Sequence, residues 1–429
     1  ETLATVYRQA FYQASDPGAQ IDYAAQLGLP NPLAAKQWPD ILSLGLNGTL
    51  FRTVFPNGDK STFYQVDNHL TKIAGKHQLQ SGFHFRRDLI NYLPQQDQSA
   101  GQASPVANWT AAWDPAGTIA SPRALPQTGS QIASSFLGMM NYGYRTTHSY
   151  FYERENQYAL YFQDNYKVTS RLTLNLGLRW SAWPAIYEKY ANIAGFDLER
   201  KAIVMARPVE QLYAQNRGLE ANVAALQKLG VKIIDNNAAG LPSSLLHSNW
   251  KNFAPRAGFA WRALGGARPL VVRGGYAITY FPVVMQSQLE RIRASIPFSS
   301  NPVYSPDSAG FSPDGRLAYS LRNVPTYVAG RNTREVLSSS SGIAGLTAGA
   351  LTVARMDPNN PDTRVHDWNL TVEREVLPKM LARAAWVGNA TRHLDAFRNY
   401  NAQTSQFVWV SNTGTAFPAN GGASRPYDP

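Results

Sequence analysis

The sequence predicts an all-β chain that forms part of an antiparallel transmembrane β-barrel with long extracellular loops. Three observations predict this fold class. Residues 171–182 alternate strictly between apolar and polar side chains, short turns alternate with long connections along the chain, and the composition is unusual for a soluble protein. Charged residues make up 16% of the 429 residues and aromatic residues 12%, whereas a soluble protein has roughly 25% charged residues. Few charges and many aromatic side chains favour a chain that meets a membrane interface.

The alternating run builds a surface with two different faces, because a strand reverses the direction of its side chains at every residue. Strands are typically about five or six residues long, so the length of this run favours a strand that crosses a membrane. The apolar set is Leu172, Leu174, Leu176, Leu178, Trp180 and Ala182, and the polar set is Arg171, Thr173, Asn175, Gly177, Arg179 and Ser181.

Composition excludes other classes of protein. No apolar run approaches the roughly 18 residues that a membrane-spanning helix needs, and the mean hydropathy is −0.32. A barrel escapes this test because half of each strand faces a polar lumen. The absence of cysteine fits an oxidising envelope compartment. The net charge is +11, but no block of basic residues with interleaved aromatics is present, so nucleic acid is not expected as a partner.

A leading strand and four hairpins are expected along the chain. The first residues, LATVYRQAFY, already alternate as a strand and no signal peptide precedes them, so we expect an interior piece of a longer polypeptide. The hairpins pair 62–73 with 78–92, 158–166 with 171–183, 252–261 with 270–280, and 365–376 with 380–388. These strands number about nine and form an arc, which other strands must close because unpaired backbone groups are costly in hydrocarbon.

Tight turns and long connections lie on opposite sides of these strands. Outer-membrane barrels have short periplasmic turns and longer extracellular loops, so residues 1–429 are interpreted as part of one barrel domain. The long loops are expected at about 14–60, 93–150, 184–250, 281–363 and 392–429, and helix formers with an apolar stripe predict a loop helix at 208–230.

The alternation also separates the faces of the other strands. Apolar side chains such as Leu79, Phe83 and Trp368 are expected to face lipid, and polar residues between them the lumen. Neither face of residues 158–166 can be assigned, because both sets mix aromatic and polar residues. Four aromatic residues at strand ends suit two interfacial girdles, namely Trp180 and Trp183 near the loops and Tyr166 and Trp261 near the turns.

Four arginines expected in the lumen are the candidate ligand-binding residues: Arg86, Arg179, Arg256 and Arg273. A cationic interior attracts anionic solutes or a complementary protein surface. The alternative is that they only form ion pairs with the acidic residues Asp88, Asp367, Glu373 and Glu375. Aromatic residues between Tyr142 and Tyr152 could hold a sugar or peptide, or pack loop against loop.

No enzyme chemistry is predicted, so the expected sets of catalytic residues, metal ligands and cofactors are empty. The seven histidines form no HExxH-type spacing, and there is no GxSxG motif, Gly-rich phosphate loop or Cys pair. His69 and His84 could approach each other across their hairpin, although ordinary lumenal polarity explains them better. The segment at 311–320 (FSPDGRLAYS) resembles a propeller blade but occurs once, and 357–362 (DPNNPD) could hold calcium. We interpret both segments as turns.

Three segments resemble the barrel of TonB-dependent receptors, in particular the Oar-like group. They are YALYFQDNYKVTSRLTLNLGLRW; NFAPRAGFAW followed by VVRGGYAITYF; and VHDWNLTVEREVLPKMLARAAWVGNATRHL. They occur in the order of that family, and the resemblance covers most of residues 60–400. It implies a barrel of 22 strands around a plug, and cargo release driven by an inner-membrane protein that pulls on a short N-terminal box. Neither plug nor box is recognisable in this chain.

The resulting prediction is a receptor-like protein of the bacterial outer membrane that binds and imports a nutrient ligand. Its expected partners are outer-membrane lipid, an unknown nutrient ligand, its own plug domain and an inner-membrane energy-coupling protein. One alternative is a structural or adhesive surface protein whose loops bind a partner while the barrel anchors it. A soluble all-β secreted protein is a further alternative, and it predicts that Leu174 and Leu176 are covered by a second sheet.

Overall fold

The computed structural model describes most of the strands and part of the loops. The described residues are 1–13, 21–31, 34–36, 38–41, 57–93, 100–105, 107–112, 114–117, 125, 127–143, 151–216, 218–228, 230–266, 268–282, 296–298, 303–304, 355–378, 380–396 and 406–416.

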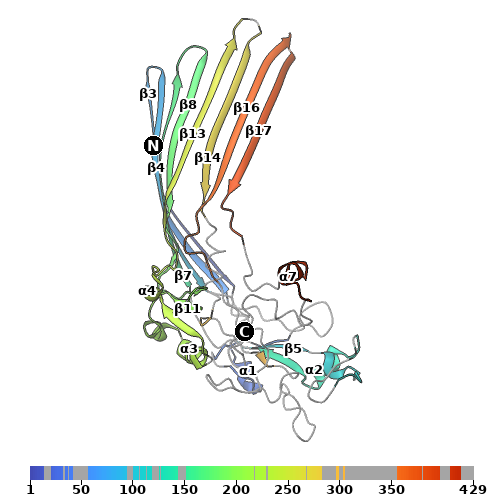
Figure 1. The fold of residues 1–429 in the computed structure, drawn as a ribbon. Coiled ribbons are helices and arrows are strands. Elements are labelled where there is room, and N and C mark those ends of the chain that lie inside the picture. The colour runs from blue at the N-terminus through green and yellow to red at the C-terminus, as the bar shows by residue number, and fades with distance from the viewer. Residues whose placement is uncertain are drawn as a thin grey trace.

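One large antiparallel sheet dominates the described structure (Figure 1). Its strand order is β1-β3-β4-β7-β8-β13-β14-β16-β17, and the short strand β9 (Tyr187–Glu188) pairs with β7. The sheet is open, with β1 and β17 at its edges. The bounds are β1 Thr2–Gln13, β3 Asn57–Ala74, β4 His77–Leu93, β7 Phe151–Lys167, β8 Leu172–Trp183, β13 Asn249–Leu264, β14 Leu270–Phe281, β16 Thr363–Leu377 and β17 Met380–Arg392.

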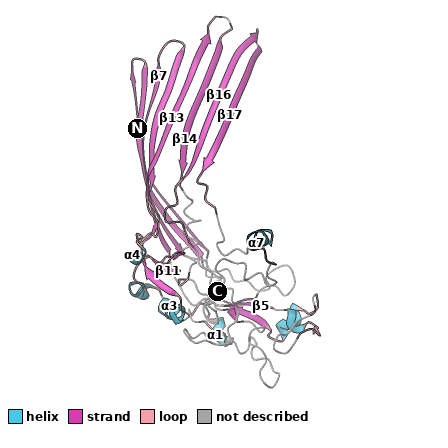
Figure 2. Cartoon of the chain, viewed as in Figure 1, coloured by secondary structure: helices cyan, strands magenta, loops and turns pink. Residues whose placement is uncertain are grey.

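The four predicted hairpins are confirmed by the antiparallel pairs β3–β4, β7–β8, β13–β14 and β16–β17. Their tight turns lie together at one end of the sheet, and the helices and short strands lie at the other end (Figure 2). Several strands extend further than the alternation indicates. β3 begins at Asn57, inside the segment 14–60 that was expected to be loop. The sequence did not predict this start, because Gly58, Asp59 and Lys60 are residue types with low strand propensity.

The pairing register assigns the faces of β7, which the sequence could not. Tyr158 lies opposite Ala182, Leu160 opposite Trp180 and Tyr166 opposite Leu174. Residues directly opposite each other in an antiparallel pair share a face. The even-numbered residues of β7 therefore lie on the face that carries the leucines of β8, which we call the apolar face; the opposite face is the polar face.

Asp164 explains why the pattern of β7 was ambiguous. It lies on the apolar face opposite Leu176, and its Oδ2 is 2.7 Å from Nδ1 of His77, which is also on that face. The imidazole of His77 stacks on the ring of Tyr166 at 4.2 Å between centroids. A carboxylate on an apolar face hides the alternation unless its partner on the neighbouring strand is known.

Aromatic side chains mark two levels on the apolar face. Near the loops, the indole N–H of Trp180 donates to the Trp250 carbonyl at 2.9 Å, and Trp250 also lies near the Tyr158 ring. Tyr158 and Tyr166 are eight residues apart on one strand, about 26 Å along the strand at the usual rise. At the usual strand tilt this is about 20 Å of height, close to the apolar band of about 25 Å in outer-membrane barrels. Trp183 does not belong to this belt. It pairs with Asn249 and lines a small cavity beside Ile186, because its position has the other parity.

A small folded unit lies beyond β8, and we call the described part of residues 184–248 the loop module. Its sheet has the order β10-β11-β12, with β10 Ala194–Asp197, β11 Ala202–Met205, β12 Lys232–Asp235, α3 Leu219–Lys228 and α4 Asn236–Ala239. Ile193, Ile203, Leu219 and Leu226 are completely buried in its core. The helix is shorter than the predicted 208–230, because Gly218 at φ +83° interrupts the run and Val209–Gln211 and Tyr213–Gln215 form 3-10 turns (η3 and η4).

A second group of short elements lies at the loop end. Its sheet has the order β15-β6-β5-β2, with β15 Val303–Tyr304, β6 Met140–Gly143, β5 Gln102–Pro105 and β2 Asp40–Ile41. The helices are α1 Tyr23–Gln26, η2 Ala107–Thr110, α2 Gln131–Phe136 and α7 Gln406–Thr413. Within the described ranges, no helix is long and apolar enough to cross a membrane.

Candidate binding surface on the polar face

All four candidate arginines lie on the polar face. The register places Arg86 opposite Gln65, Arg179 opposite Tyr161, Arg256 opposite Gly177 and Arg273 opposite Thr371. Followed from strand to strand, the register puts each of these positions on the face opposite to the leucines of β8. The structure thus brings the four side chains to one surface, but it gives them different environments.

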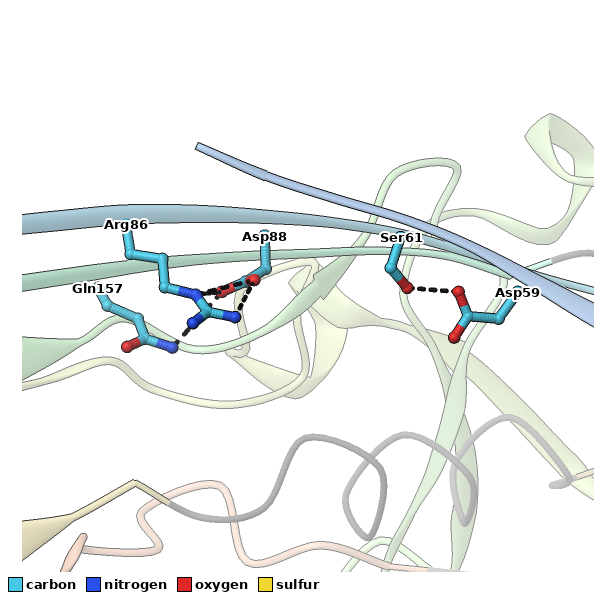
Figure 3. A network of polar contacts seen from close by, with 5 residues as sticks. All are labelled: Asp59, Ser61, Arg86, Asp88 and Gln157. Atoms are coloured by element: carbon cyan, nitrogen blue, oxygen red, sulfur yellow. Dashed lines mark hydrogen bonds and ion pairs between the residues drawn. The ribbon is translucent and has the colours of Figure 1, made fainter. Parts of the chain in front are cut away.

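Arg86 is held by a carboxylate on its own strand. Its Nε and Nη2 donate to Asp88 at 3.0 and 2.8 Å, and its guanidinium lies 4.2 Å from the centre of the Phe63 ring. Gln157 of β7 donates to the same buried carboxylate at 3.5 Å (Figure 3). Arg86 therefore fits the alternative in which an arginine solvates the wall.

Arg273 is paired as well, across strands. Its Nη1 lies 3.1 Å from Oε2 of Glu373, whose other oxygen lies 3.4 Å from Nε of Arg383. Arg179 donates from Nε to the hydroxyl of Ser181 at 3.0 Å. Of the predicted ion pairs, those with Asp88 and Glu373 are thus present.

Arg256 differs from the other three, because it has no hydrogen bond or ion pair with any described residue. It borders a shallow groove of about 220 Å³. The floor lacks side chains where Gly258 lies opposite Gly275 on the next strand. A Cβ on Gly177 would lie 2.9 Å from Cγ of Arg256, so this glycine lets the arginine stem lie flat. The polar residues around the floor are Gln163, Asn175, Arg256, Asp367 and Asn369.

The charges of this groove stand apart. Arg256 lies opposite Ala277, which in turn lies opposite Asp367, so the backbones that carry the cation and the carboxylate are two strands apart, or about 10 Å. The three amide side chains that line the groove, Gln163, Asn175 and Asn369, supply both hydrogen-bond donors and acceptors. This arrangement can bind a polar or zwitterionic group, and sequence reasoning identified only its arginine, because the glycine floor is contributed by strands far apart in the chain.

The other sequence candidates have local partners. His84 Nδ1 lies 2.7 Å from Asp67 Oδ1, and His69 Nδ1 bonds the Tyr161 hydroxyl. No group of three or more metal-ligating residues occurs among the described residues. Residues 357–362 form the expected turn, in which the Asn359 N–H donates to Asp357 Oδ1 at 3.0 Å. Residues 311–320 lie outside the described residues.

The ends of the aromatic segment between Tyr142 and Tyr152 pack inside the loops. Tyr142 is completely buried, and its hydroxyl donates to the Ala100 carbonyl at 3.1 Å; burial raises its pKa. Phe151 is 1% exposed and belongs to the core that includes the loop module. These two residues favour loop packing over ligand contact, and residues 144–150 lie outside the described part of the chain.

Glu188 organises the junction between the loop module and β7, and no sequence signal pointed to it. Its side chain is 3% exposed and accepts backbone hydrogen bonds from Tyr152, Tyr190 and Asn192 at 2.9, 2.7 and 2.8 Å. Burial raises the pKa of this carboxyl, although the three hydrogen bonds act in the opposite direction.

The raised pKa of Glu188 predicts a pH dependence of the loop module. Between the ordinary and the raised pKa, the native protein binds more protons than the unfolded chain, so the free energy of unfolding falls as pH rises through that window. We expect protection from hydrogen exchange in residues 184–248, taken relative to the intrinsic rate at each pH, to be highest at the acidic end of the window, with a smaller pH dependence in Glu188→Gln. An identical pH dependence in the two proteins would contradict this assignment.

Comparison with known proteins gives the family. A family model of the outer membrane beta barrel domain matches residues 2–429, and no curated protein matches. Solved structures with a similar fold include the outer membrane transporter YddB from Escherichia coli (11% identity, TM-score 0.35, 82% of this chain and 28% of that chain). Others are FpvA from P. aeruginosa bound to heterologous pyoverdines (12%, 0.25, 79% and 33%) and the alcaligin outer membrane receptor FauA from Bordetella pertussis (11%, 0.21, 79% and 47%).

The chain spans less than half the length of each of these three structures. Their low TM-scores add no argument beyond the family match. An outer-membrane barrel explains the observed sheet, because its apolar face meets lipid and its polar face lines the lumen. Since the family model covers nearly the whole sequence, the chain belongs to the outer membrane beta barrel domain family and is a protein of the bacterial outer membrane.

Proposed function

We propose that this chain is part of the barrel of a TonB-dependent receptor-like protein of the Oar-like group, which binds and imports a nutrient ligand. The family supports the barrel, and the three resembling segments in their characteristic order support the group. A barrel of 22 strands with its own plug and an inner-membrane energy-coupling protein is part of the same proposal. The other strands pair with the open edges of β1 and β17.

The observation that carries the proposal is Arg256 beside the glycine-floored groove. Its guanidinium has no partner in the described part of the chain and is available to a ligand, whereas those of Arg86 and Arg273 are already engaged by carboxylates. Charge-assisted hydrogen bonds to a ligand are roughly twice as strong as neutral ones. Arg256 is therefore the arginine that we propose contacts cargo or the plug on the transport path, and the other three support the wall.

The proposal is tested by uptake in cells that carry the full-length protein. Solutes that disappear from the medium with wild type, but not with a deletion strain, identify the cargo by mass spectrometry. We expect Arg256→Gln to slow the uptake of that solute about tenfold, the effect of losing one hydrogen bond to a charged group. Arg273→Gln is the matched control on the same face and is expected to change uptake less than about twofold.

If the same solutes remained in the medium with wild type and with the deletion strain, import would be overturned altogether. Equal effects of the two substitutions would leave import standing and remove the role of Arg256.

The folded loop module supports a second candidate function, in which a structural or adhesive protein presents its loops to a partner. The module has its own buried core and is fastened to β7 through Glu188, so it offers a preformed surface. This function predicts normal uptake, but loss of surface attachment, when residues 184–248 are replaced by a short linker.

A further inference from the structure

Basic residues lie at the loop-side end of the apolar face. On six strands, the first charged side chain beyond the apolar and aromatic stretch is an arginine or lysine. The pairing register assigns all six to the apolar face, and we call them the basic collar: Arg8, Lys60, Arg87, Arg154, Arg364 and Arg392.

Acidic residues at the same end point the other way. Asp59, Asp88, Glu153 and Glu155 all lie at polar-face positions of the register. Within the nine long strands as described, Asp164 is the sole acidic residue on the apolar face, and it lies near the turns, paired with His77. The loop end of the sheet therefore has a positive outer surface and a negative inner one.

Arg364 and Arg392 are the two collar residues that face each other across neighbouring strands. They are directly opposite each other on β16 and β17, an arrangement in which like charges destabilise a sheet. Neither has an ion pair or hydrogen bond with a described residue, and the Nε atom of Arg364 is buried without a hydrogen-bond partner. Two facing guanidinium groups are stabilised by an anion that accepts hydrogen bonds from both, and phosphate matches their geometry.

The rest of the collar extends the positive surface along the sheet. Arg8, Lys60 and Arg87 are exposed and have no hydrogen-bond or ion-pair partner among the described residues. Arg154 is the exception, since it donates to the Ile90 carbonyl at 3.2 Å and to Asn91 at 3.0 Å. Arg87 and Arg154 lie just beyond the level of Tyr158 on their strands, and Arg364 lies directly opposite Tyr280. Because interfacial aromatic residues sit at the level of lipid headgroups, the height of the collar is that of headgroups rather than acyl chains.

We propose that the basic collar binds the phosphate groups of lipid headgroups in the outer leaflet, and that Arg364 and Arg392 together hold one phosphate. The occupant follows from charge complementarity and from the position of the collar on the lipid-facing surface of an outer-membrane barrel whose long loops are extracellular. The proposal concerns the outer wall and is independent of any ligand imported through the lumen.

The test is native mass spectrometry of the full-length protein in detergent, titrated with diphosphorylated lipid A. We expect Arg364→Gln/Arg392→Gln to weaken binding about twenty-five-fold, or about fivefold for each basic residue. The charge-preserving pair Arg364→Lys/Arg392→Lys should stay within about threefold of wild type. Retained heat-modifiable migration in gel electrophoresis shows that each variant has folded. If the glutamine pair has not folded, the single variant Arg392→Gln, expected to weaken binding about fivefold, decides the test.

The matched control removes the same charge at the other end of the same face. Lys72→Gln/Arg374→Gln alters apolar-face positions near the turns and is expected to change lipid A binding less than about twofold. An equal loss in this control would overturn the proposal, as would equal binding of dephosphorylated lipid A. Complete displacement of lipid A by inorganic phosphate alone would also overturn it, because the site would then be one for a soluble anion.

Discussion

Replacing Glu188 with alanine is expected to detach the loop module from β7. The substitution leaves three backbone N–H groups, those of Tyr152, Tyr190 and Asn192, without their acceptor. Hydrogen bonds to a charged group are each worth about 1.5–3 kcal/mol, and removal of the buried charge offsets part of the loss. We therefore expect the module to lose about 4 kcal/mol of local stability.

The measurement is hydrogen exchange and limited proteolysis of the full-length protein. Exchange should accelerate in residues 184–248, while the paired strands of the large sheet keep their protection. Glu210→Ala is the matched control, because this glutamate is exposed in the same module. Unchanged exchange in Glu188→Ala would show that the module is held by its apolar core alone.

Replacing Gly82 with alanine is expected to disturb the pairing of β3 and β4. A Cβ at this position would overlap the carbonyl oxygen of Asn68 and lie 2.6 Å from Cε1 of Tyr161. The first neighbour is the backbone of the adjacent strand and cannot rotate away, so the two strands must separate locally. Overpacking of this kind costs about 1–3 kcal/mol, and lost hydrogen bonds add to it.

The matched control for this prediction is Gly258→Ala on the same polar face. Its Cβ would lie 3.4 Å from the Gly274 carbonyl oxygen and 3.9 Å from Asn175, which requires little movement. Urea titration of the folded protein in detergent, followed by gel mobility, should give a lower midpoint for Gly82→Ala than for Gly258→Ala. Equal midpoints would contradict the close packing at Gly82.

The hairpins and most faces could be predicted because they depend on neighbouring residues. Strand parity is a property of the local chain, and so the lipid-facing set from Leu172 to Ala182 follows from residues 171–182 alone. The bond between Arg86 and Asp88 is equally local, since the two side chains are two residues apart on one face. The faces of β7 could not be predicted, because the polar Asp164 lies on the apolar face. Its position there is explained only by its partner His77 on β4.

The candidate site was predicted only in part, for a related reason. The parity of each arginine was predictable, but its partner was not. Glu373, which engages Arg273, is contributed by a strand one hundred residues away in the chain (373 against 273). Gly258 and Gly275 are unremarkable in the sequence, and they form a floor only because the register sets them opposite each other.

The sequence by itself determined that this protein is an outer-membrane β-barrel and which of its side chains share a face, because alternation, turn spacing and composition are read along the chain. The tertiary structure decided which charges meet. Register across long connections leaves Arg256 without a partner among the described residues, sets Arg364 opposite Arg392 and brings Glu188 to three backbone donors. A shift of a single residue in any pairing would invert a strand and change all of these neighbours, and for that reason they could not be derived from local pattern.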